Sequence, residues 1–448
     1  MLLIVRGDLQ SETGWSRATR ALVDCIADQF TAIAGVDRHF HPNRSIGHFC
    51  GGIVSEMAAM QMASHHRGNV VLHAVLPNDI VRYAGSINLG WWFWETDALP
   101  ATSDWIERIN SLDHLLVPSP WQAELIKKLD IRIPISIVPW PHSNFDLTSV
   151  RDEGSDTRIL PSLVAYQPFE QVKVGVALGI DDSYRFGLHS NSSVASLVKE
   201  KAALVTGQRR TLNTVLQSYK GYFFAVQSDA PRKGLPVLIS EWCRYCSQIE
   251  RPNALVIRFS SLNVNHDTEA ALQRFSEIAY GASRGAPGLE HVFVILDQLS
   301  EKTMESLYRG AVATISPTYG EGFGGTIVEA VRAGCLPIAP RHTACGQLLP
   351  DDYPNTYQSK PYIGKLIDQL PIQPASGSWH LPVPGEITRL MRRTETLSQE
   401  QRHLELIRLR QFMKGVLSPS GARSTILEAI GGCVDLNEDT KARGVLHA

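Results

Sequence analysis

Two glutamates enclose a cluster of glycines in the segment SPTYGEGFGGTIVEAVRAG, residues 316–334. Glu321 and Glu329 stand eight positions apart. The glycines are Gly320, Gly322, Gly324 and Gly325. Glycine lets a ligand approach the main chain closely, and a carboxylate accepts hydrogen bonds at both oxygens. The segment therefore combines a bare backbone with two groups that can bind hydroxyls.

The flanking residues predict a strand, then this loop, then a helix. AVATISP (311–317) is typical of a buried strand, and TIVEAVRAG (326–334) has helical spacing and ends at Gly334, a residue type common at helix C-termini. The loop would then join the carboxyl end of a strand to a helix N-terminus. Unpaired N–H groups and a partial positive charge at that end favour phosphate.

The two carboxylates suggest which chemical groups are attached to such a phosphate. Glu329 would lie about one turn, roughly 5 Å, further along the helix, where it suits a vicinal diol such as that of ribose. Glu321 precedes the helix and would face the other end of the ligand. A nucleoside diphosphate linked to a sugar fits all three features. The alternative is a structural loop with a helix cap and a solvated charge pair.

Cations are needed beside such a ligand, because each carboxylate repels a nearby diphosphate by roughly 1 to 4 kcal/mol. Arg232 and Lys233 follow the strand-like run YFFAVQ (222–227) in the sequence QSDAPRKGLPVLISEW. They would lie at the carboxyl end of another parallel strand, where open α/β sheets bind ligands. Arginine grips phosphate with two hydrogen bonds, and lysine adds a point charge.

Alternating strand-like and helical runs predict the fold class. The apolar runs are 70–75, 114–119, 135–140, 222–227, 254–260, 291–296, 311–317 and 336–340. With 448 residues, the chain predicts an α/β protein of two Rossmann-like domains, each a doubly wound parallel sheet. The expected divisions are an N-terminal domain, 1–190, with an irregular or inserted connection at 143–215, a C-terminal domain, 216–400, and C-terminal helices, 401–448.

Composition narrows the function class. The chain has 43 Lys and Arg, 45 Asp and Glu and a net charge of −2, which gives no argument for a nucleic acid partner. The first apolar run is too short for a secretory signal, and none reaches the roughly 20 residues of a spanning helix. We expect a cytoplasmic protein and leave a peripheral contact with the inner face of the membrane open. The basic stretch 386–414 predicts a helix that either faces solvent or meets anionic lipid.

Metal and redox sites are weighed against packing. Cys243 and Cys246 form a CxxC at helical spacing, which favours packing over a metal or redox role because no second pair follows. The histidines between 39 and 73 match no familiar ligand spacing: they are His39, His41, His48, His65, His66 and His73. We therefore predict no metal site.

GEGFGGTIVEAVRAGCLPIAP resembles the Glu-x7-Glu region of retaining glycosyltransferases of family 4, which have the GT-B fold. The matching residues are Glu321, Gly322, Phe323, Gly324, Glu329, Ala330, Gly334 and Pro337. APRKGLPVLISEW is similar to the segment in which that family's lysine binds donor phosphate, and Lys233 takes its place. The family's partner arginine stands earlier, where this chain has Gln227 or Ser228, so Arg232 is the expected substitute.

The N-terminal half resembles the same family more weakly. Gly14 in QSETGWSRATRAL matches one of two glycines near the donor diphosphate. LGWWFWETD, which begins at Leu89, has no histidine where many relatives have one. We expect Trp94 to stack on a sugar, whereas Glu95 either orients an acceptor hydroxyl or caps a turn.

The resemblance implies two domains facing a cleft, with the helices of 401–448 crossing back to the N-terminal domain. It also implies transfer of a sugar, with retention, from a UDP- or GDP-sugar to a glycan, lipid-linked or protein-linked acceptor. The expected catalytic residues are Glu321, Lys233 and Glu95. The expected donor-binding residues are Gly14, Arg232, Lys233, Gly322, Phe323, Gly324, Gly325, Thr326 and Glu329. No metal or other cofactor is expected. The alternatives are a non-catalytic partner of a sister transferase and a GT-B epimerase or phosphorylase; base, sugar and acceptor stay open.

Overall fold

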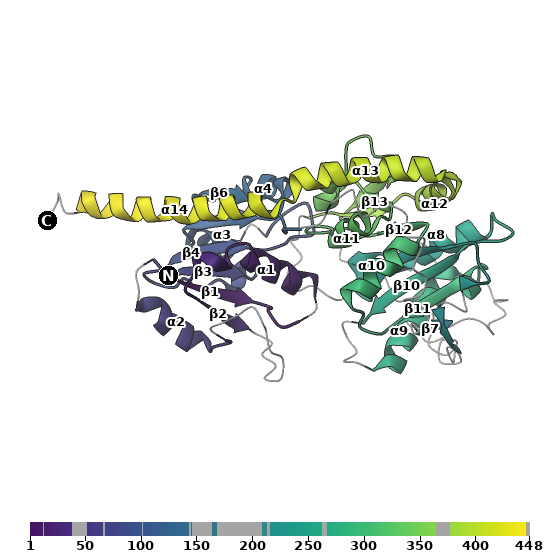
Figure 1. Cartoon of the computed structure of the whole chain (residues 1–448), viewed down its shortest axis with the longest axis horizontal. Helices are drawn as coiled ribbons and strands as arrows, with labels where there is room; N and C mark the ends of the chain where they lie inside the picture. Colours follow the sequence, from purple (N-terminus) through teal and green to yellow (C-terminus); the bar gives the residue numbers. More distant parts are fainter. Residues whose placement is uncertain are drawn as a thin grey trace. The chain divides into compact units, whose positions relative to one another are not determined.

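The computed structural model describes residues 1–37 except 12, 52–65, 68–142 except 101, 145, 164–167, 208–212, 216–261, 267–363 and 377–444. The chain divides into two compact units (Figure 1). The first contains Met1–Asn144 and Lys414–Ala448, and the second contains Phe145–Met413. Each unit is described by itself below.

A six-stranded parallel sheet forms the centre of the first unit, in the order β2-β1-β3-β4-β5-β6. The strands are β1 (Leu2–Gly7), β2 (Ala32–Asp37), β3 (Val70–Ala74), β4 (Ile87–Trp91), β5 (His114–Val117) and β6 (Ile135–Ile137). The helices are α1 (Gly14–Asp24), α2 (Glu56–Ser64), α3 (Ser103–Asn110), α4 (Pro120–Ile126) and α14 (Pro419–Gly444), with short 3-10 turns η1 (Ala27–Gln29) and η2 (Pro77–Asp79). Nearly every side chain of β1, β3, β4 and β5 is buried.

Helix α14 belongs to the first unit although it lies at the far end of the sequence. It lies against β4, β5 and β6. Its buried side chains recur at helical spacing: Ala422, Ile426, Ala429, Ile430 and Cys433. This apolar stripe explains why the chain returns to the first unit after Met413.

The second unit contains an eight-stranded sheet in the order β14-β13-β12-β9-β10-β11-β7-β8. The first six in this order are parallel, and β7 and β8 add antiparallel edge strands. Their bounds are β7 (Val164–Gln167), β8 (Gln208–Thr211), β9 (Tyr222–Ser228), β10 (Ala254–Ser260), β11 (Val292–Ile295), β12 (Ala313–Ile315), β13 (Pro337–Pro340) and β14 (Thr356–Tyr357). A separate hairpin pairs β15 (Ser359–Tyr362) with β16 (Trp379–Pro382).

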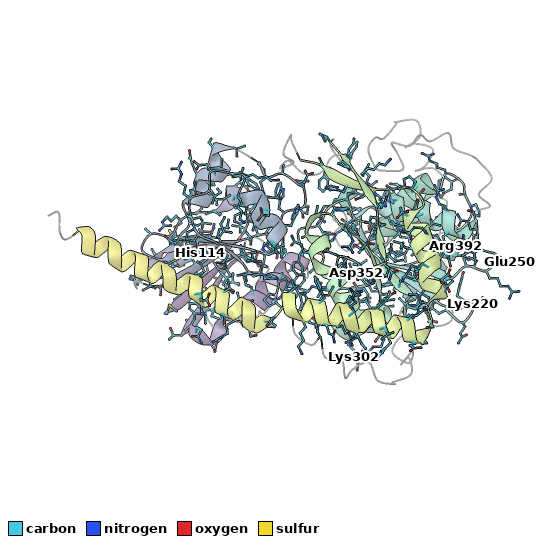
Figure 2. The ribbon with its side chains drawn as sticks, turned by 90° about the horizontal axis from the view of Figure 1, so that it is seen from above. His114, Lys220, Glu250, Lys302, Asp352 and Arg392 are labelled. Carbon is cyan, nitrogen blue, oxygen red and sulfur yellow. The ribbon has the colours of Figure 1, made fainter. Side chains whose placement is uncertain are left out.

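Helices cover both faces of this sheet. They are α8 (Leu235–Cys246), α9 (Thr268–Ser283), α10 (Glu301–Gly310), α11 (Gly325–Ala333), α12 (Glu386–Thr396) and α13 (Gln399–Val416), with 3-10 turns η5 (Pro231–Lys233), η6 (Leu289–His291) and η7 (Thr343–Leu348). Side chains of β9 alternate between two cores: Phe223 and Ala225 pack with α8, α9 and α12, whereas Tyr222 and Phe224 pack with α10 and α11. Period-two alternation between two apolar layers is the reason that the strand reads as continuously hydrophobic. Figure 2 shows how side chains fill the described part of the chain.

The strand order of the second sheet changes direction between β9 and β12. Strands β10 and β11 follow β9 on one side, and β13 and β14 follow β12 on the other. The helices that follow β9 and β12, α8 and α11, therefore contribute to opposite faces of the sheet. Such a point is where open parallel sheets place their ligand sites.

All eight predicted apolar runs contain a strand, and Gly334 ends α11 in the left-handed conformation, with φ of 86°. The boundary between units differs from the expected one, because β7 pairs with β11 of the second sheet rather than with the first. Most of the segment 143–215 lies outside the described residues, as do His39, His41, His48 and His66. No described helix is long and apolar enough to cross a membrane.

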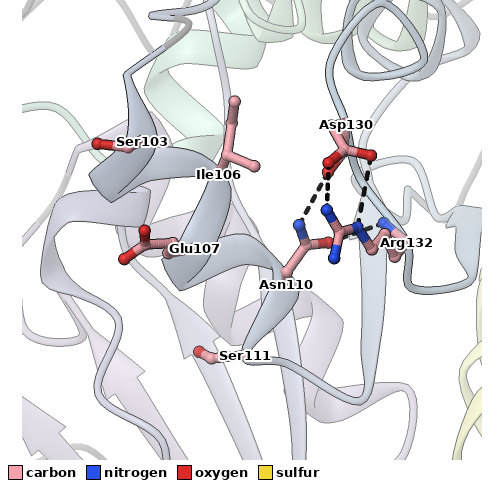
Figure 3. A pocket seen from close by; sticks show the side chains of 7 residues that line it. All are labelled: Ser103, Ile106, Glu107, Asn110, Ser111, Asp130 and Arg132. Carbon is pink, nitrogen blue, oxygen red and sulfur yellow. Dashed lines mark hydrogen bonds and ion pairs between the residues drawn. The ribbon is translucent and has the colours of Figure 1, made fainter.

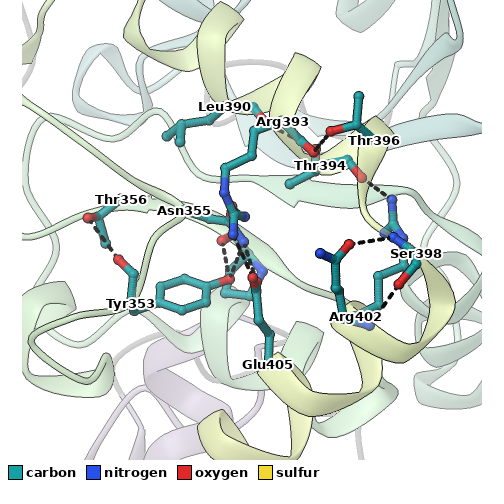
Figure 4. A network of polar contacts seen from close by, with 12 residues as sticks. Tyr353, Asn355, Thr356, Leu390, Arg393, Thr394, Thr396, Ser398, Arg402 and Glu405 are labelled. Atoms are coloured by element: carbon teal, nitrogen blue, oxygen red, sulfur yellow. Dashed lines mark hydrogen bonds and ion pairs between the residues drawn. The ribbon is translucent and has the colours of Figure 1, made fainter.

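The basic stretch 386–414 is two helices rather than one, since α12 ends at Thr396 and α13 begins at Gln399. Its arginines bind protein groups within the second unit (Figure 4). Arg393 donates to Glu405 Oε1 at 2.6 Å, and Arg402 donates to the carbonyl of Val312 at 2.6 Å. Arg408 pairs with Asp352, which Figure 2 labels. These arginines therefore hold the helices onto the unit.

Candidate active site

Two loops meet at the direction change of the second sheet. The Tyr319 N–H donates to the Arg232 carbonyl at 2.8 Å, and Thr318 Oγ1 donates to the same oxygen at 3.1 Å. Gly234 follows the 3-10 turn η5 with φ of +71°, and a Cβ there would lie 2.1 Å from the Pro317 carbonyl oxygen. Only glycine permits this close approach. The loops after β9 and β12 are therefore locked together.

This locking brings Glu321 to the two predicted cations. Lys233 Nζ lies 2.5 Å from Glu321 Oε1, and Arg232 Nη1 lies 3.2 Å from Glu321 Oε2. Arg232 also donates to the Gly320 carbonyl at 3.3 Å. Each carboxylate oxygen therefore faces its own cation, and the three side chains carry a net charge of about +1 at neutral pH.

Glu321 stays ionised in this setting. Its side chain is only 12% exposed. Burial on its own raises the pKa of the carboxyl, but the charges and hydrogen bonds of Lys233 and Arg232 outweigh burial and lower the pKa to about 2. At neutral pH Glu321 can accept hydrogen bonds and stabilise positive charge, and it has no proton to donate.

The main chain of Glu321 is held from a third loop, after β13. Its N–H donates to Thr343 Oγ1 at 3.1 Å, and its carbonyl accepts from the Ala344 N–H at 3.2 Å. Thr343 has a φ of +52°, a left-handed conformation that is rare for a β-branched residue. Strain of this kind persists only where the surroundings impose it, often at functional sites.

The N-terminus of α11 lacks a side-chain cap. Its N-cap residue is Gly324, with φ of +101° and no side-chain hydrogen bond. Within the described part of the chain, the N–H groups of Gly325 and Thr326 have no hydrogen-bond acceptor. A Cβ on Gly324 would lie 3.0 Å from Leu348 and 3.2 Å from the Cys345 sulfur. The bare terminus is therefore built by packing that demands glycine.

The rest of α11 is fixed at Glu329 and at its C-terminus. Glu329 is partly buried and accepts a hydrogen bond from the Tyr308 hydroxyl at 3.2 Å. The Arg410 guanidinium, which is buried, donates to the carbonyls of Val331 at 3.0 Å and Arg332 at 2.6 Å. A cation at the C-terminal carbonyls stabilises the helix dipole.

Two imidazoles stack beside this site and escaped the sequence analysis. The His342 and His380 rings lie 4.6 Å apart and nearly parallel, at 14°. The His380 N–H of the main chain donates to the Tyr319 carbonyl at 2.9 Å. Burial, helped by His380, lowers the pKa of His342 to about 3, so its ring is neutral at physiological pH. No local sequence signal links these two residues, because His342 follows β13 and His380 lies within β16.

The remaining predicted residues of the second unit lie on the same loop. Gly322 and Phe323 are buried, and Gly325 and Thr326 are partly exposed. The structure thus brings together all nine predicted residues of this unit, whose roles stay predictions. They are Arg232, Lys233, Glu321, Gly322, Phe323, Gly324, Gly325, Thr326 and Glu329.

The two predicted residues of the first unit have different surroundings. Gly14 is the first residue of α1, whose N-cap is Thr13. Glu95 is partly exposed and lies between β4 and α3. The expectation that Trp94 stacks on a sugar is wrong: it is 5% exposed, packs against Trp105, and donates its indole N–H to the Ala98 carbonyl at 2.8 Å. The Trp94 ring is therefore packed in the protein interior, as are the rings of Trp91 and Trp92.

A surface hollow of about 540 Å³ beside α3 is a weaker candidate (Figure 3). Its polar groups already bind one another. Asn110 donates to the Asp130 carbonyl at 2.8 Å, the Arg132 N–H donates to Asn110 at 2.7 Å, and Arg132 pairs with Asp130 at 2.5 Å. A ligand would have to displace these contacts.

The predictions about metal and redox sites concern clusters of ligating side chains and the CxxC pair. Within that part of the chain, no three His, Cys, Asp or Glu side chains are grouped as metal ligands. Cys243 and Cys246 are free and lie on α8. Both sulfur-bearing residues pack against Gly288, where a Cβ would lie 3.0 Å from the Cys246 sulfur.

Comparison with known proteins gives a structural match without a sequence match. No model of a known protein family matches the chain, and no curated protein does. A trehalose 6-phosphate synthase from Burkholderia multivorans aligns over 98% of this chain and 98% of its own, with TM-score 0.58 and 9% identity. The sucrose-phosphate synthase of Thermosynechococcus elongatus aligns over 97% of this chain and 99% of its own, with TM-score 0.57 and 11% identity.

A third similar structure is the N-terminal domain of a trehalose-6-phosphate phosphatase from Candida albicans. It aligns over 96% of both chains, with TM-score 0.57 and 10% identity. These likenesses span both units, and at such low identity they concern the fold. The chain therefore has the GT-B fold, a pair of Rossmann-like α/β units.

Proposed function

We propose that this protein is a glycosyltransferase that moves a sugar from a nucleoside diphosphate sugar to an acceptor hydroxyl. The observation that carries the proposal is the pair of cations, Arg232 and Lys233, beside the uncapped N-terminus of α11. Together they form an anion site at the direction change of a parallel sheet. The similar sugar-phosphate synthases support this reading through the shared fold.

The proposed roles follow from charge and position. Lys233 and Arg232 would stabilise the negative charge that develops on the departing diphosphate, and the N–H groups of Gly325 and Thr326 would assist. Two cationic side chains would supply this charge without a metal ion. Glu329 would bind the ribose hydroxyls. Glu321, ionised throughout the physiological range, would bind sugar hydroxyls and stabilise a cationic sugar carbon rather than protonate a leaving group.

Two finer statements rest on the Glu-x7-Glu pattern alone. We propose that transfer retains the anomeric configuration and that the chain is related to family 4 transferases. Glu95 and the first unit would serve the acceptor, which is a glycan, lipid-linked or protein-linked hydroxyl. Gly14 stays proposed as a donor-binding residue. Product stereochemistry by NMR, with the donor identified below, tests retention directly.

The second candidate is a non-catalytic partner of a sister transferase. It is favoured by the loop after β1, where Asp8 accepts hydrogen bonds from Thr13 Oγ1 at 2.9 Å and from the Ser11 N–H at 3.2 Å. The Asp8 carboxylate thus already binds hydrogen-bond donors of this loop that could otherwise bind a diphosphate. Fold likeness at this level does not decide the activity, since one similar structure is part of a phosphatase.

The experiment that separates the candidates is donor turnover. Purified protein is incubated with UDP- and GDP-sugars, and release of the nucleoside diphosphate is measured with and without sugar and glycan acceptors. A transferase releases the diphosphate, at least by slow hydrolysis. A protein that binds a donor and never turns it over supports the partner hypothesis.

A further inference from the structure

We propose that Tyr308 is a positioning residue for nucleotide recognition: its hydroxyl sets the Glu329 carboxylate for a ribose diol. This inference rests on the proposed function, because it assigns a second residue to the same ligand. The residue comes from α10, which precedes β12, and not from the glycine loop.

The Tyr308 ring is held in place by the side chains that surround it. Only 1% of the residue is exposed. Its ring meets the Phe224 ring edge to face, with centroids 5.0 Å apart at 84°. It belongs to the apolar core that includes Phe224 of β9 and Ala330 of α11. The position of the hydroxyl is therefore fixed by packing.

The hydroxyl is directed at the one carboxylate of α11. Tyr308 Oη donates to Glu329 Oε2 at 3.2 Å. The ring thus delivers a polar atom through an otherwise apolar core to the helix that starts at the anion site. A buried tyrosine hydroxyl normally has a partner, and this one has a partner that carries charge.

The contact restricts the carboxylate without exhausting it. Two carboxylate oxygens offer about four acceptor positions, of which the hydroxyl takes one. A glutamate on a partly exposed helix face otherwise samples several rotamers. The Tyr308 hydroxyl narrows the orientations of Glu329, and a carboxylate has more acceptor positions than this one contact uses, as binding of a diol requires. Preorganisation of this kind raises affinity for the ligand that matches it.

A neighbouring tyrosine provides a matched control. Tyr222 is buried in the same core and donates its hydroxyl to the Leu307 carbonyl at 2.6 Å. Tyr222→Phe and Tyr308→Phe each remove one buried hydroxyl from the same region. Only Tyr308→Phe removes a contact to Glu329, so a merely structural effect should appear equally in both.

The test is the preference for ribose over deoxyribose. Binding of UDP, GDP and ADP and of their 2′-deoxy forms is measured by calorimetry for the wild type, Tyr308→Phe, Tyr222→Phe, Glu329→Gln and the double variant Tyr308→Phe/Glu329→Gln. We expect the wild type to prefer the ribose form about tenfold, the gain of one charge-assisted hydrogen bond. Tyr308→Phe should reduce this preference to about twofold and leave the Kd of the deoxy form unchanged. Tyr222→Phe should keep the full preference, and Tyr308→Phe should add nothing to Glu329→Gln.

An unchanged ribose preference in folded Tyr308→Phe overturns the inference and leaves the proposed function standing. Equal binding of ribose and deoxyribose forms by the wild type overturns it too. If Tyr308→Phe does not fold, Glu329→Gln decides: a full ribose preference in that variant contradicts the inference. Failure of the wild type to bind any of the three diphosphates rejects the proposed function and this inference together.

Discussion

Helices α1 and α11 occupy comparable places in the two units, and their ends differ in one respect. Each follows a strand at the direction change of its sheet. Each has an arginine from the C-terminal helices on its last carbonyls: Arg423 donates to the Cys25 carbonyl at 2.7 Å, and Arg410 binds the end of α11. The C-terminal ends are thus treated alike.

The N-terminal ends are treated in opposite ways. At α1, Thr13 Oγ1 accepts the Ser16 N–H at 3.2 Å and donates to the Asp8 carboxylate. The Asp37 carboxylate accepts the N–H groups of Leu9 at 3.0 Å and Gln10 at 2.9 Å. In the first unit the protein supplies its own anions to this loop. At α11 a glycine replaces the cap, and two cations, Arg232 and Lys233, share one carboxylate, that of Glu321. Cap chemistry, more than the fold, determines which unit offers an anion site.

The largest expected effect comes from removing the cation at α11. Lys233→Met should lower the rate of donor turnover about 100- to 1000-fold, because it removes a charge aimed at the departing diphosphate. Glu321→Ala should cause a loss of similar order. Steady-state kinetics at matched folding measures both.

Lys302→Met is the matched control, since Lys302 is exposed on α10 of the same unit. Its turnover should equal that of the wild type. Full turnover in both Lys233→Met and Glu321→Ala would reject the assignment of this site.

The two C-terminal arginines should differ in what they contribute to stability. Arg410→Met removes the guanidinium, on a residue that is 3% exposed, that donates to the Val331 and Arg332 carbonyls, and should lower the free energy of unfolding by about 2 to 3 kcal/mol. Arg423→Met breaks a pair in which Asp28 is 66% exposed, so the loss should stay below about 1 kcal/mol. Denaturant unfolding of the two variants gives the comparison. Equal losses of unfolding free energy in the two variants would mean that the burial of Arg410 does not increase its contribution to stability.

The two helix-start glycines offer a smaller and sharper contrast. Gly324→Ala forces an alanine into φ of +101° and against Leu348 and Cys345, and should cost about 1 to 2 kcal/mol. At Gly14 an added Cβ has its nearest neighbour 4.0 Å away, on Trp140, so Gly14→Ala should be neutral or stabilise by about 0.5 kcal/mol.

Donor affinity of Gly14→Ala adds a second readout. A folded Gly14→Ala variant with a much weaker donor Kd would show that the loop of the first unit also touches the donor. An unchanged Kd restricts the diphosphate contacts to α11 and the loop after β9.

A further expected effect concerns the dependence of stability on acid pH. Glu321 has its folded pKa lowered from 4.5 to about 2, so its ionised form contributes stability above pH 4.5, and this contribution is lost as the pH falls towards 2. The stability difference between wild type and Glu321→Gln should therefore shrink by about 3 kcal/mol between pH 5 and pH 2, because each unit of pKa shift corresponds to about 1.4 kcal/mol. A difference that stays constant over this interval would mean that Glu321 is not paired as described.

Local patterns predicted the sheets and the glycine loop because these depend on neighbours in sequence. Buried parallel strands are short apolar runs, and Gly334 ends its helix where glycine is favoured. The carboxyl-end rule also brought Lys233 towards Glu321 across 88 positions. Contacts that depend on packing escaped prediction. Tyr308 resembles any core aromatic residue in the sequence, and only the packed structure shows its hydroxyl at Glu329.

The wrong prediction for Trp94 had the same origin. Trp94 follows a strand and precedes a carboxylate, which favours exposure, yet a neighbouring helix buries it against Trp105. The alternatives for the basic stretch 386–414, solvent or lipid, stay predictions for its exposed arginines. Two other arginines of the stretch, Arg402 and Arg410, donate to carbonyls 90 and 79 positions away in the sequence. Long side chains find partners that spacing alone cannot reveal.

The most direct test of the anion site compares a nucleoside diphosphate with its nucleoside. Thermal shifts of wild type and Lys233→Met are measured with UDP, GDP and ADP and with uridine, guanosine and adenosine. For the wild type, one diphosphate should stabilise the fold by about 2.7 kcal/mol at a hundredfold excess over its Kd, and its nucleoside should do far less. Lys233→Met should lose most of this difference. Equal shifts for diphosphate and nucleoside, or a difference that survives in Lys233→Met, would contradict an anion site built from Lys233 and the start of α11.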